Sequence, residues 1–287
     1  MQKILSVAIG LALAQFVSTP IFAADATEDF IDVNESLSLD NTSQAQTKTF
    51  NFGKNVIYTR NGKIALNGQG GKKDLTINVK NGSGDFIVRD RYAPIQLDNS
   101  DIHLKFNSNL VMEGMEYAGI MYSSGNVPRE LNITGDFIYR DSYATAIEAS
   151  TGNFRGNLFV ITIDGKADLR NVSIHGNGKT TASGSLLNLG ATDFEAKQGV
   201  FIDNIDGNTA GDWNTAIFLV NGSLKAENQN IEITNINFNV ASRVNTSIYV
   251  QSSPVKAKNI LIKGLTNKYD NDLYGYINGT EANTVSD

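Results

Sequence analysis

The sequence contains no cysteine, two histidines, four prolines and one tryptophan, and its 30 acidic residues outnumber its 24 basic ones. The absence of cysteine excludes a disulfide scaffold and thiolate zinc sites, and two histidines are few for any transition-metal site. We therefore expect no metal and no cofactor. The net charge of -6 argues against a nucleic-acid partner, because phosphate binding requires a basic surface. Stability must come from burial of apolar side chains and from backbone hydrogen bonds.

Long apolar runs are also scarce, and the one that is present lies at the N-terminus. Lys3 precedes an apolar stretch over residues 4–22, and small residues follow it. This pattern is typical of a secretory signal peptide. We expect a signal peptide over 1–23, with cleavage after residue 26 as an alternative, and a polar linker or cap over 24–50. An uncleaved anchor is the other interpretation, because the run has the length of a short membrane span.

Turn-forming residues are abundant, with 26 glycines and 33 asparagines. Asn-Gly pairs, which favour tight turns, begin at Asn61, Asn81, Asn177, Asn221 and Asn278. Between the turns, apolar and polar residues alternate over four to six positions, as in the segments DIHLKF and NIEITNINFNV. A period of two residues indicates β-strands, and helical periodicity is nearly absent.

The alternating segments recur through the chain at intervals of about 30 residues. Aligning them superposes one apolar anchor in each copy: Ile64, Ile95, Ile120, Ile147, Leu187, Ile217, Ile248 and Ile277. Most anchors are followed by apolar residues after two and after seven positions, and each is preceded at two positions by a small residue. We expect a corner at the small residue and two strands after it. Such internal repetition is the signature of a repeat architecture.

A third strand follows in five of the copies, at a variable distance from the anchor. It is marked by the pairs Leu131 and Ile133, Phe159 and Ile161, Val200 and Ile202, Ile231 and Ile233, and Ile260 and Ile262. The interval from Ile147 to Leu187 is the longest, and we attribute its excess to a strand pair inserted over 159–174.

Three short strands per repeat predict an all-β fold, a right-handed parallel β-helix of about eight coils of roughly 30 residues each over 51–287. Each coil can bury its apolar face only against neighbouring coils, so many coils are required. An antiparallel sandwich or a propeller would also contain many short strands, but neither predicts equivalent residues every 30 positions.

A signal peptide, the lack of cysteine and Asn/Gly-rich repeats such as NTAIFLVNGSLKAENQNIEI resemble the passenger region of bacterial type V autotransporters, which are pertactin-like β-helices. The resemblance implies export by a Gram-negative bacterium, display on or release from the cell surface, and adhesion or aggregation without catalysis. The implied partner is a glycan or protein of a host or bacterial surface, or a second copy. Members of that family continue into an outer-membrane barrel. We therefore expect a C-terminally truncated passenger that would contact the membrane only through this barrel.

The same β-helix is used by polysaccharide lyases and glycoside hydrolases of the pectin-lyase-like group, which is the alternative function. A hydrolase requires carboxylates that converge on one face. The candidates are Asp90, Asp141, Asp203 and Asp206. Met115 stands at the matching position between the first two, and isolated Asp-Arg pairs are usually surface ion pairs, so we expect no catalytic residues.

Aromatic residues stand three or four positions before several anchors. They are Tyr92, Tyr117, Tyr143 and Trp213, with Tyr274 in the last copy. Stacked coils would align them in a ladder that either packs at a corner or, if exposed, offers ring faces to a sugar or a protein. One position after the anchors, Met121, Phe218 and Tyr249 should point outward, and an exposed apolar strip there would mark a contact surface.

Overall fold

The computed structural model describes residues 29–39, 43–59, 64–67, 71–90, 94–98, 101–123, 128–150, 159–174, 184–207, 213–238, 244–267, 273–277 and 281–286. The predicted signal peptide lies outside these residues. Throughout the described ranges the chain is built from β-strands, with a short 3-10 turn at η2 (Lys80–Gly82). No helix in the described part is long and apolar enough to cross a bilayer.

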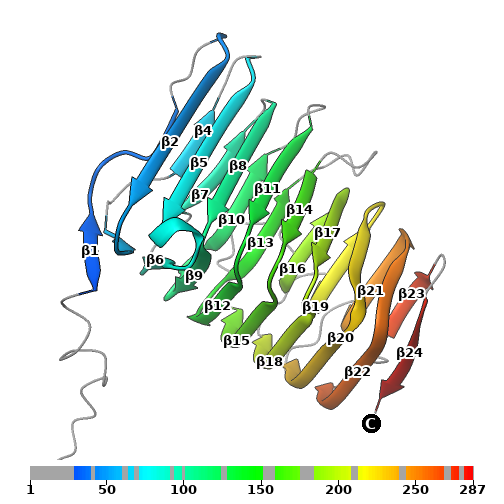
Figure 1. The fold of residues 1–287 in the computed structure, drawn as a ribbon. Coiled ribbons are helices and arrows are strands. Elements are labelled where there is room, and N and C mark those ends of the chain that lie inside the picture. Colours follow the sequence, from blue (N-terminus) through cyan, green and yellow to red (C-terminus); the bar gives the residue numbers. More distant parts are fainter. Residues whose placement is uncertain are drawn as a thin grey trace, which may run out of the picture.

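The strands form three parallel stacks, and the chain visits them in turn, so that successive coils lie side by side from β1 to β24 (Figure 1). The anchor stack contains β4 (Ile64–Asn67), β7 (Ile95–Asp98), β10 (Ala118–Ser123), β13 (Thr145–Ser150), β16 (Gly184–Gly190), β19 (Trp213–Val220), β21 (Val244–Ser253) and β23 (Leu273–Ile277).

The second stack contains β2 (Gln46–Phe52), β5 (Lys73–Val79), β8 (Ile102–Asn107), β11 (Arg129–Ile133), β14 (Phe159–Ile163), β17 (Thr192–Ala196) and the first parts of β20 (Ser223–Phe238) and β22 (Val255–Asn267). The third stack contains β1 (Phe30–Val33), β3 (Asn55–Tyr58), β6 (Asp85–Arg89), β9 (Asn109–Glu113), β12 (Phe137–Ser142), β15 (Ala167–Ile174), β18 (Val200–Gly207) and the remainders of β20 and β22. The final strand, β24 (Glu281–Ser286), pairs with β22. The predicted parallel β-solenoid is confirmed.

The anchor residues lie in one column and fill the interior. Each anchor from Ile64 to Ile248 pairs in register with the next, and all seven are fully buried. The last anchor was predicted wrongly. Ile248 pairs with Leu273, whereas Ile277 pairs with Ser253 across a register shift. The spacing of apolar residues does not reveal this shift, because it falls between Gln251 and Ser253 within β21.

The assignment of the second and third strands is partly wrong. In four coils the residue seven positions after the anchor lies in the second stack, as predicted: Ile102, Phe194, Leu224 and Val255. The column of Phe194 continues through the earlier coils as Ile161, Leu131 and Leu104, so Ile102 lies two residues ahead of it in β8. The strands of Leu131 and Ile161 therefore belong to the second stack. A fixed offset fails because the connection from the anchor strand differs in length between coils; Val127 and Phe154 lie outside the described residues.

The coil between Ile147 and Leu187 contains no inserted strand pair. Its strands β14 and β15 pair with β11 and β12 on one side and with β17 and β18 on the other, as ordinary members of their stacks. The excess length of this coil falls in 151–158 and 175–183, outside the described residues.

The extent of the solenoid also differs slightly from the prediction. The molecule completes about six turns, although eight strands line the anchor stack. At the N-terminal end, β1 pairs with β3 and β2 pairs with β5. Part of the segment expected to be a linker or cap therefore already belongs to the solenoid, and the boundary at residue 51 was placed too late.

A column of left-handed residues forms a bend within the third stack. It consists of Asp90, Gly114, Asp141, Asn171, Asn204, Asn235 and Gly264, whose φ angles lie between 49° and 69°. Glycine, asparagine and aspartate tolerate this conformation better than other residues. Each bend interrupts the alternation, so that Leu169 and Val172, three positions apart, are both buried in β15. Gly114, and not Met115, therefore stands between Asp90 and Asp141.

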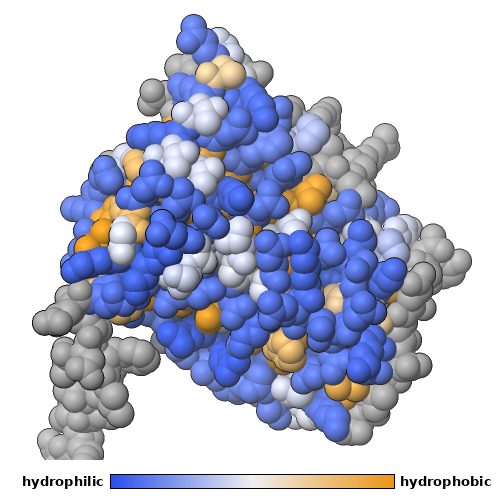
Figure 2. Space-filling view, viewed as in Figure 1, coloured by the Kyte–Doolittle hydropathy of each residue, from blue (hydrophilic) through white to orange (hydrophobic). Residues whose placement is uncertain are grey.

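The described surface in view is mostly hydrophilic, with scattered apolar residues (Figure 2). The expected exposed apolar strip is not present: Phe218 and Tyr249 are 7% and 9% exposed, and Met121 is half-buried. The rings of Phe218 and Tyr249 stack on each other with centroids 5.1 Å apart. These side chains lie outside the main core, as alternation predicts, but Phe218 and Tyr249 are buried in a separate small cluster with Val220.

Candidate functional site

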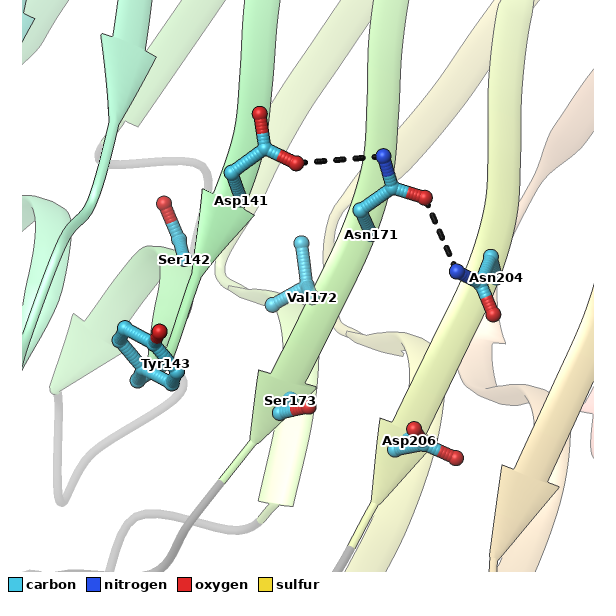
Figure 3. A pocket seen from close by; sticks show the side chains of 8 residues that line it. All are labelled: Asp141, Ser142, Tyr143, Asn171, Val172, Ser173, Asn204 and Asp206. Atoms are coloured by element: carbon cyan, nitrogen blue, oxygen red, sulfur yellow. Dashed lines mark hydrogen bonds between the residues drawn. The ribbon is translucent and has the colours of Figure 1, made fainter. Parts of the chain in front are cut away.

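A pocket of about 290 Å³ lies across three successive coils, at the ends of β12, β15 and β18. Its lining is mostly polar: Asp141, Ser142, Tyr143, Asn171, Val172, Ser173, Asn204 and Asp206. Figure 3 shows Asp141, Asn171 and Asn204 in a row along one side, with Tyr143, Ser173 and Asp206 on the other. Because the three strands are neighbours in one stack, residues far apart in the sequence are brought together here.

The row of residues on one side of the pocket is a hydrogen-bonded ladder. The Asn171 side-chain amide donates to Asp141 Oδ1 at 3.2 Å, and that of Asn204 donates to Asn171 Oδ1 at 2.9 Å. All three residues have left-handed backbones and belong to the bend column. The same conformation that turns the chain thus presents their polar groups to solvent.

Tyr143 stands at the corner between β12 and β13 and is 56% exposed. Its backbone N–H donates to Met115 O at 2.8 Å. The neighbouring Ser142 hydroxyl accepts from the Met115 N–H and donates to the Arg140 carbonyl. Beneath the corner, the buried Tyr139 hydroxyl donates to Ala144 O at 2.8 Å. The corner is therefore held from below and from the preceding coil, while the Tyr143 ring remains exposed.

Burial raises the pKa of Tyr139 well above its usual range, because the phenolate would lie in an apolar interior. The hydroxyl therefore keeps its proton, and with it the hydrogen bond that supports the corner.

Two of the four candidate carboxylates line the pocket. Asp141 and Asp206 are both exposed, and each accepts a hydrogen bond from an asparagine, Asn171 and Asn237 respectively. Asp203 lies outside the pocket and accepts from Thr234 at 2.6 Å. Asp90 shares the bend column with Asp141 but is two coils away, which corresponds to about 10 Å.

The carboxylates lack the asymmetry that glycoside hydrolysis requires. In such enzymes one carboxyl group is kept protonated by an apolar environment while the other stays ionised. Here Asp141 and Asp206 have similar, solvated environments. Nor do three histidine, aspartate or glutamate side chains come together as metal ligands among the residues that the structure describes. The pocket is better suited to hydrogen bonding and ring stacking.

The predicted aromatic residues do not form a single column. Tyr117 is half-buried and lies three positions before its anchor, whereas Tyr143 lies four before, and Ile120 pairs with Ile147. The two tyrosines are therefore staggered by one residue. Trp213 shares the offset of Tyr143 and its backbone belongs to β19. The side chain of Trp213 and the whole of Tyr92 lie outside the described residues. Of the two predicted binding residues whose side chains the structure describes, Tyr117 and Tyr143, it places Tyr143 in the pocket.

The asparagine and serine residues of the pocket were not found from the sequence. Asn171, Ser173 and Asn204 lie in segments that read simply as strands. What could have revealed them in the sequence is a break in the apolar–polar alternation, where two polar residues stand next to each other. This occurs at Arg170–Asn171 and Asp203–Asn204.

No protein-family model, curated protein or solved structure matches this chain.

Proposed function

We propose that the protein is an exported β-solenoid of the autotransporter-passenger type, which acts at or beyond the bacterial cell surface as an adhesive, non-catalytic protein. The N-terminal segment with the features of a signal peptide supports export, and the cysteine-free solenoid suits an exported rod stabilised by its core. The ligand is a surface glycan bound at the pocket around Tyr143.

The exposed ring of Tyr143 is the observation that carries this proposal. Together with Val160 it is one of the two large apolar side chains that are prominently exposed in the described part of the chain. A sugar ring can pack its apolar face on a tyrosine, while its hydroxyls exchange hydrogen bonds with carboxylates and amides. The pocket provides both kinds of group, because Asp141, Asn171 and Asp206 line it beside the ring.

Glycan binding can be tested with immobilised bacterial and host polysaccharides and the purified protein. Tyr143→Ala should weaken binding about tenfold or more, as expected for the loss of a stacked ring. Val160→Ala is the matched control, because it removes the other exposed apolar side chain from a different stack and should bind as wild type. Equal binding by both variants would exclude the pocket as the glycan site.

Export has a separate test. The full chain can be expressed in a Gram-negative host, and the periplasmic and secreted protein sequenced from its N-terminus. We expect mature chains that begin after residue 23 or 26. Protein found only in the cytoplasm, with its N-terminus intact, would refute export without affecting glycan binding.

A polysaccharide-degrading activity is the second candidate, since Asp141 and Asp206 line one pocket. It predicts release of reducing ends or unsaturated products from pectic polysaccharides, and their loss in Asp141→Asn and Asp206→Asn. The adhesive proposal predicts that wild type leaves the polysaccharide intact while binding it.

A further inference from the structure

One column of side chains on the outer side of the anchor stack is buried in its central and late coils. It runs through Gln96, Met121, Glu148, Asn188, Phe218 and Tyr249, each in register with the next. Its central members, Glu148 and Asn188, are each 6% exposed. A glutamate is rarely buried to this extent unless it is paired with a positive charge or carries a proton.

No cation lies beside Glu148 in this column. Met121 of β10 precedes it and Asn188 of β16 follows it, and the next member is Phe218 of β19. On the outer sides of β10 and β16, the neighbours of Met121 and Asn188 include Gly119, Leu186 and Gly190, which carry no charge.

The charged and titratable groups that act in this region lie toward the interior. Tyr122 of β10 lies within electrostatic range of position 148 and of Arg129 of β11, whose side chain is fully buried. Burial raises the pKa of Tyr122 well above its usual range, so its hydroxyl stays protonated and donates to Gly190 O at 2.6 Å. The pKa of Glu148 responds to burial and to the hydrogen bond from Asn188 and not to Arg129, so this cation does not compensate a carboxylate at position 148.

Glu148 and Asn188 share one hydrogen bond, and one oxygen atom of each side chain has no hydrogen-bond partner. The Asn188 amide Nδ2 donates to Glu148 Oε1 at 3.2 Å. The other oxygen of each side chain, Glu148 Oε2 and Asn188 Oδ1, is buried without a hydrogen-bond partner. Both are acceptors when glutamate is ionised, so neither can satisfy the other. A single proton on Glu148 Oε2 converts it into the donor that Asn188 Oδ1 lacks.

We infer that Glu148 is a neutral carboxylic acid in the folded protein and forms a reciprocal acid–amide pair with Asn188, which breaks when the proton is released to solvent. Two hydrogen bonds then join the side chains: Nδ2–H to Oε1, and Oε2–H to Oδ1. Loss of the proton leaves a buried carboxylate facing an amide oxygen. The outer side of β13 and β16, next to the stacked rings of Phe218 and Tyr249, is thereby a pH-sensitive part of the solenoid.

The pH range follows from burial, which raises the pKa of Glu148 to about 7, while the hydrogen bond from Asn188 partly opposes the rise. The ordinary value is 4.5. Between these values the folded state binds a proton that the unfolded state has released, so stability falls as pH increases. The stabilising effect of the neutral pair is complete below pH 4.5 and is lost as pH rises through 7.

The test is Glu148→Gln, because glutamine reproduces the neutral pair by donating to Asn188 Oδ1 and accepting from Nδ2 at every pH. Urea unfolding at pH 5 and pH 8 should show wild type losing stability relative to E148Q, by about tenfold or more in the unfolding equilibrium constant. Glu232→Gln is the control, since Glu232 also accepts a hydrogen bond from an asparagine, Asn230, but is only half-buried. It should differ little from wild type in its pH dependence.

A spectroscopic measurement decides the matter even if E148Q does not fold. Infrared spectra of protein labelled with carbon-13 glutamate should show a protonated carboxyl band in the wild type at pH 6, which disappears above pH 8. In E232Q the band should persist. Absence of this band at pH 6, or an equal loss of stability with pH in E148Q and wild type, would overturn the inference.

Discussion

The outward side chains of the anchor stack and those of the third stack follow the same two-residue alternation but have different surroundings. On the anchor stack, the outward side chains of Glu148, Asn188, Phe218 and Tyr249 are buried. Glu148 is paired with the neutral amide of Asn188. On the third stack, the equivalent column carries partly exposed ions, among them Arg140 and Arg170. Alternation therefore tells which side chains leave the interior, but not whether they reach water.

The largest difference between a covered outer side and an exposed one should appear when an outward apolar side chain is truncated. Phe218→Ala should cost about 3 kcal/mol, because it removes a buried ring together with its stacking contact to Tyr249. Val160→Ala, on the exposed face of β14, should cost less than about 0.5 kcal/mol. Urea unfolding measures both. If the two variants lose equal stability, the outer side of the anchor stack is open to solvent and the contrast fails.

Loss of the amide in the buried pair should have the next largest effect. Asn188→Leu leaves the Glu148 carboxyl buried without a partner and should cost about 2 kcal/mol at pH 7. The comparison on the third stack is Asn237→Leu, which removes the donor to the exposed Asp206 carboxylate at 2.9 Å and should change stability by less than about 0.5 kcal/mol. A smaller cost for Asn188→Leu than for Asn237→Leu would show that burial of the pair has no energetic consequence.

Substitutions that strain the backbone of the bend column should reduce stability by an intermediate amount. Asn204 has φ 56°, which a β-branched residue adopts with strain, and its amide bonds to Asn171. Asn204→Val should therefore cost about 1–3 kcal/mol, whereas Asn204→Gly should be close to neutral. Thermal unfolding of the two variants separates strain from loss of the amide. Equal destabilisation would assign the whole effect to the hydrogen bond.

The smallest effect is expected at the ions of the third stack. Glu113 Oε2 accepts from Arg140 at 3.0 Å, and Glu113 also pairs with Arg89. These arginine side chains are partly exposed, so solvent screens the pairs, and Glu113→Gln should cost less than about 1 kcal/mol. The loss of stability in Glu113→Gln should become smaller in high salt. A cost above that of Asn188→Leu, independent of salt, would contradict the distinction between a solvated face and a covered one.

The repeat was predictable because apolar residues recur at equivalent positions of the sequence. The seven anchors from Ile64 to Ile248 are apolar at equivalent positions, and all of them pair and are buried. Strand membership was less predictable. Leu131 and Ile161 were assigned to the third strand, yet they pair with each other and with Leu104 and Phe194 of the second stack. Their distance from the anchor depends on the length of the connection between the anchor strand and the next strand. The alternating pattern within a strand does not reveal this length.

The candidate site was predictable only in part. Tyr143 was found because it is an aromatic residue at a repeating offset, and Asp141 and Asp206 because they are acidic. Their meeting in one pocket depends on the register of β12, β15 and β18, together with the left-handed bends that direct Asp141, Asn171 and Asn204 to the surface. An asparagine within a strand pattern does not by itself reveal that conformation.

The amino-acid sequence alone determined the class of fold and the residues that fill its interior, because a period of two residues and a spacing of about 30 suffice to mark strands that stack on one another. Only the tertiary structure decided which outward side chains are covered. Phe218 and Tyr249 are outward and apolar, and Glu148 is outward and acidic, yet all three are buried. Coverage depends on which parts of the chain come to lie over a face, and a local pattern contains no information about that.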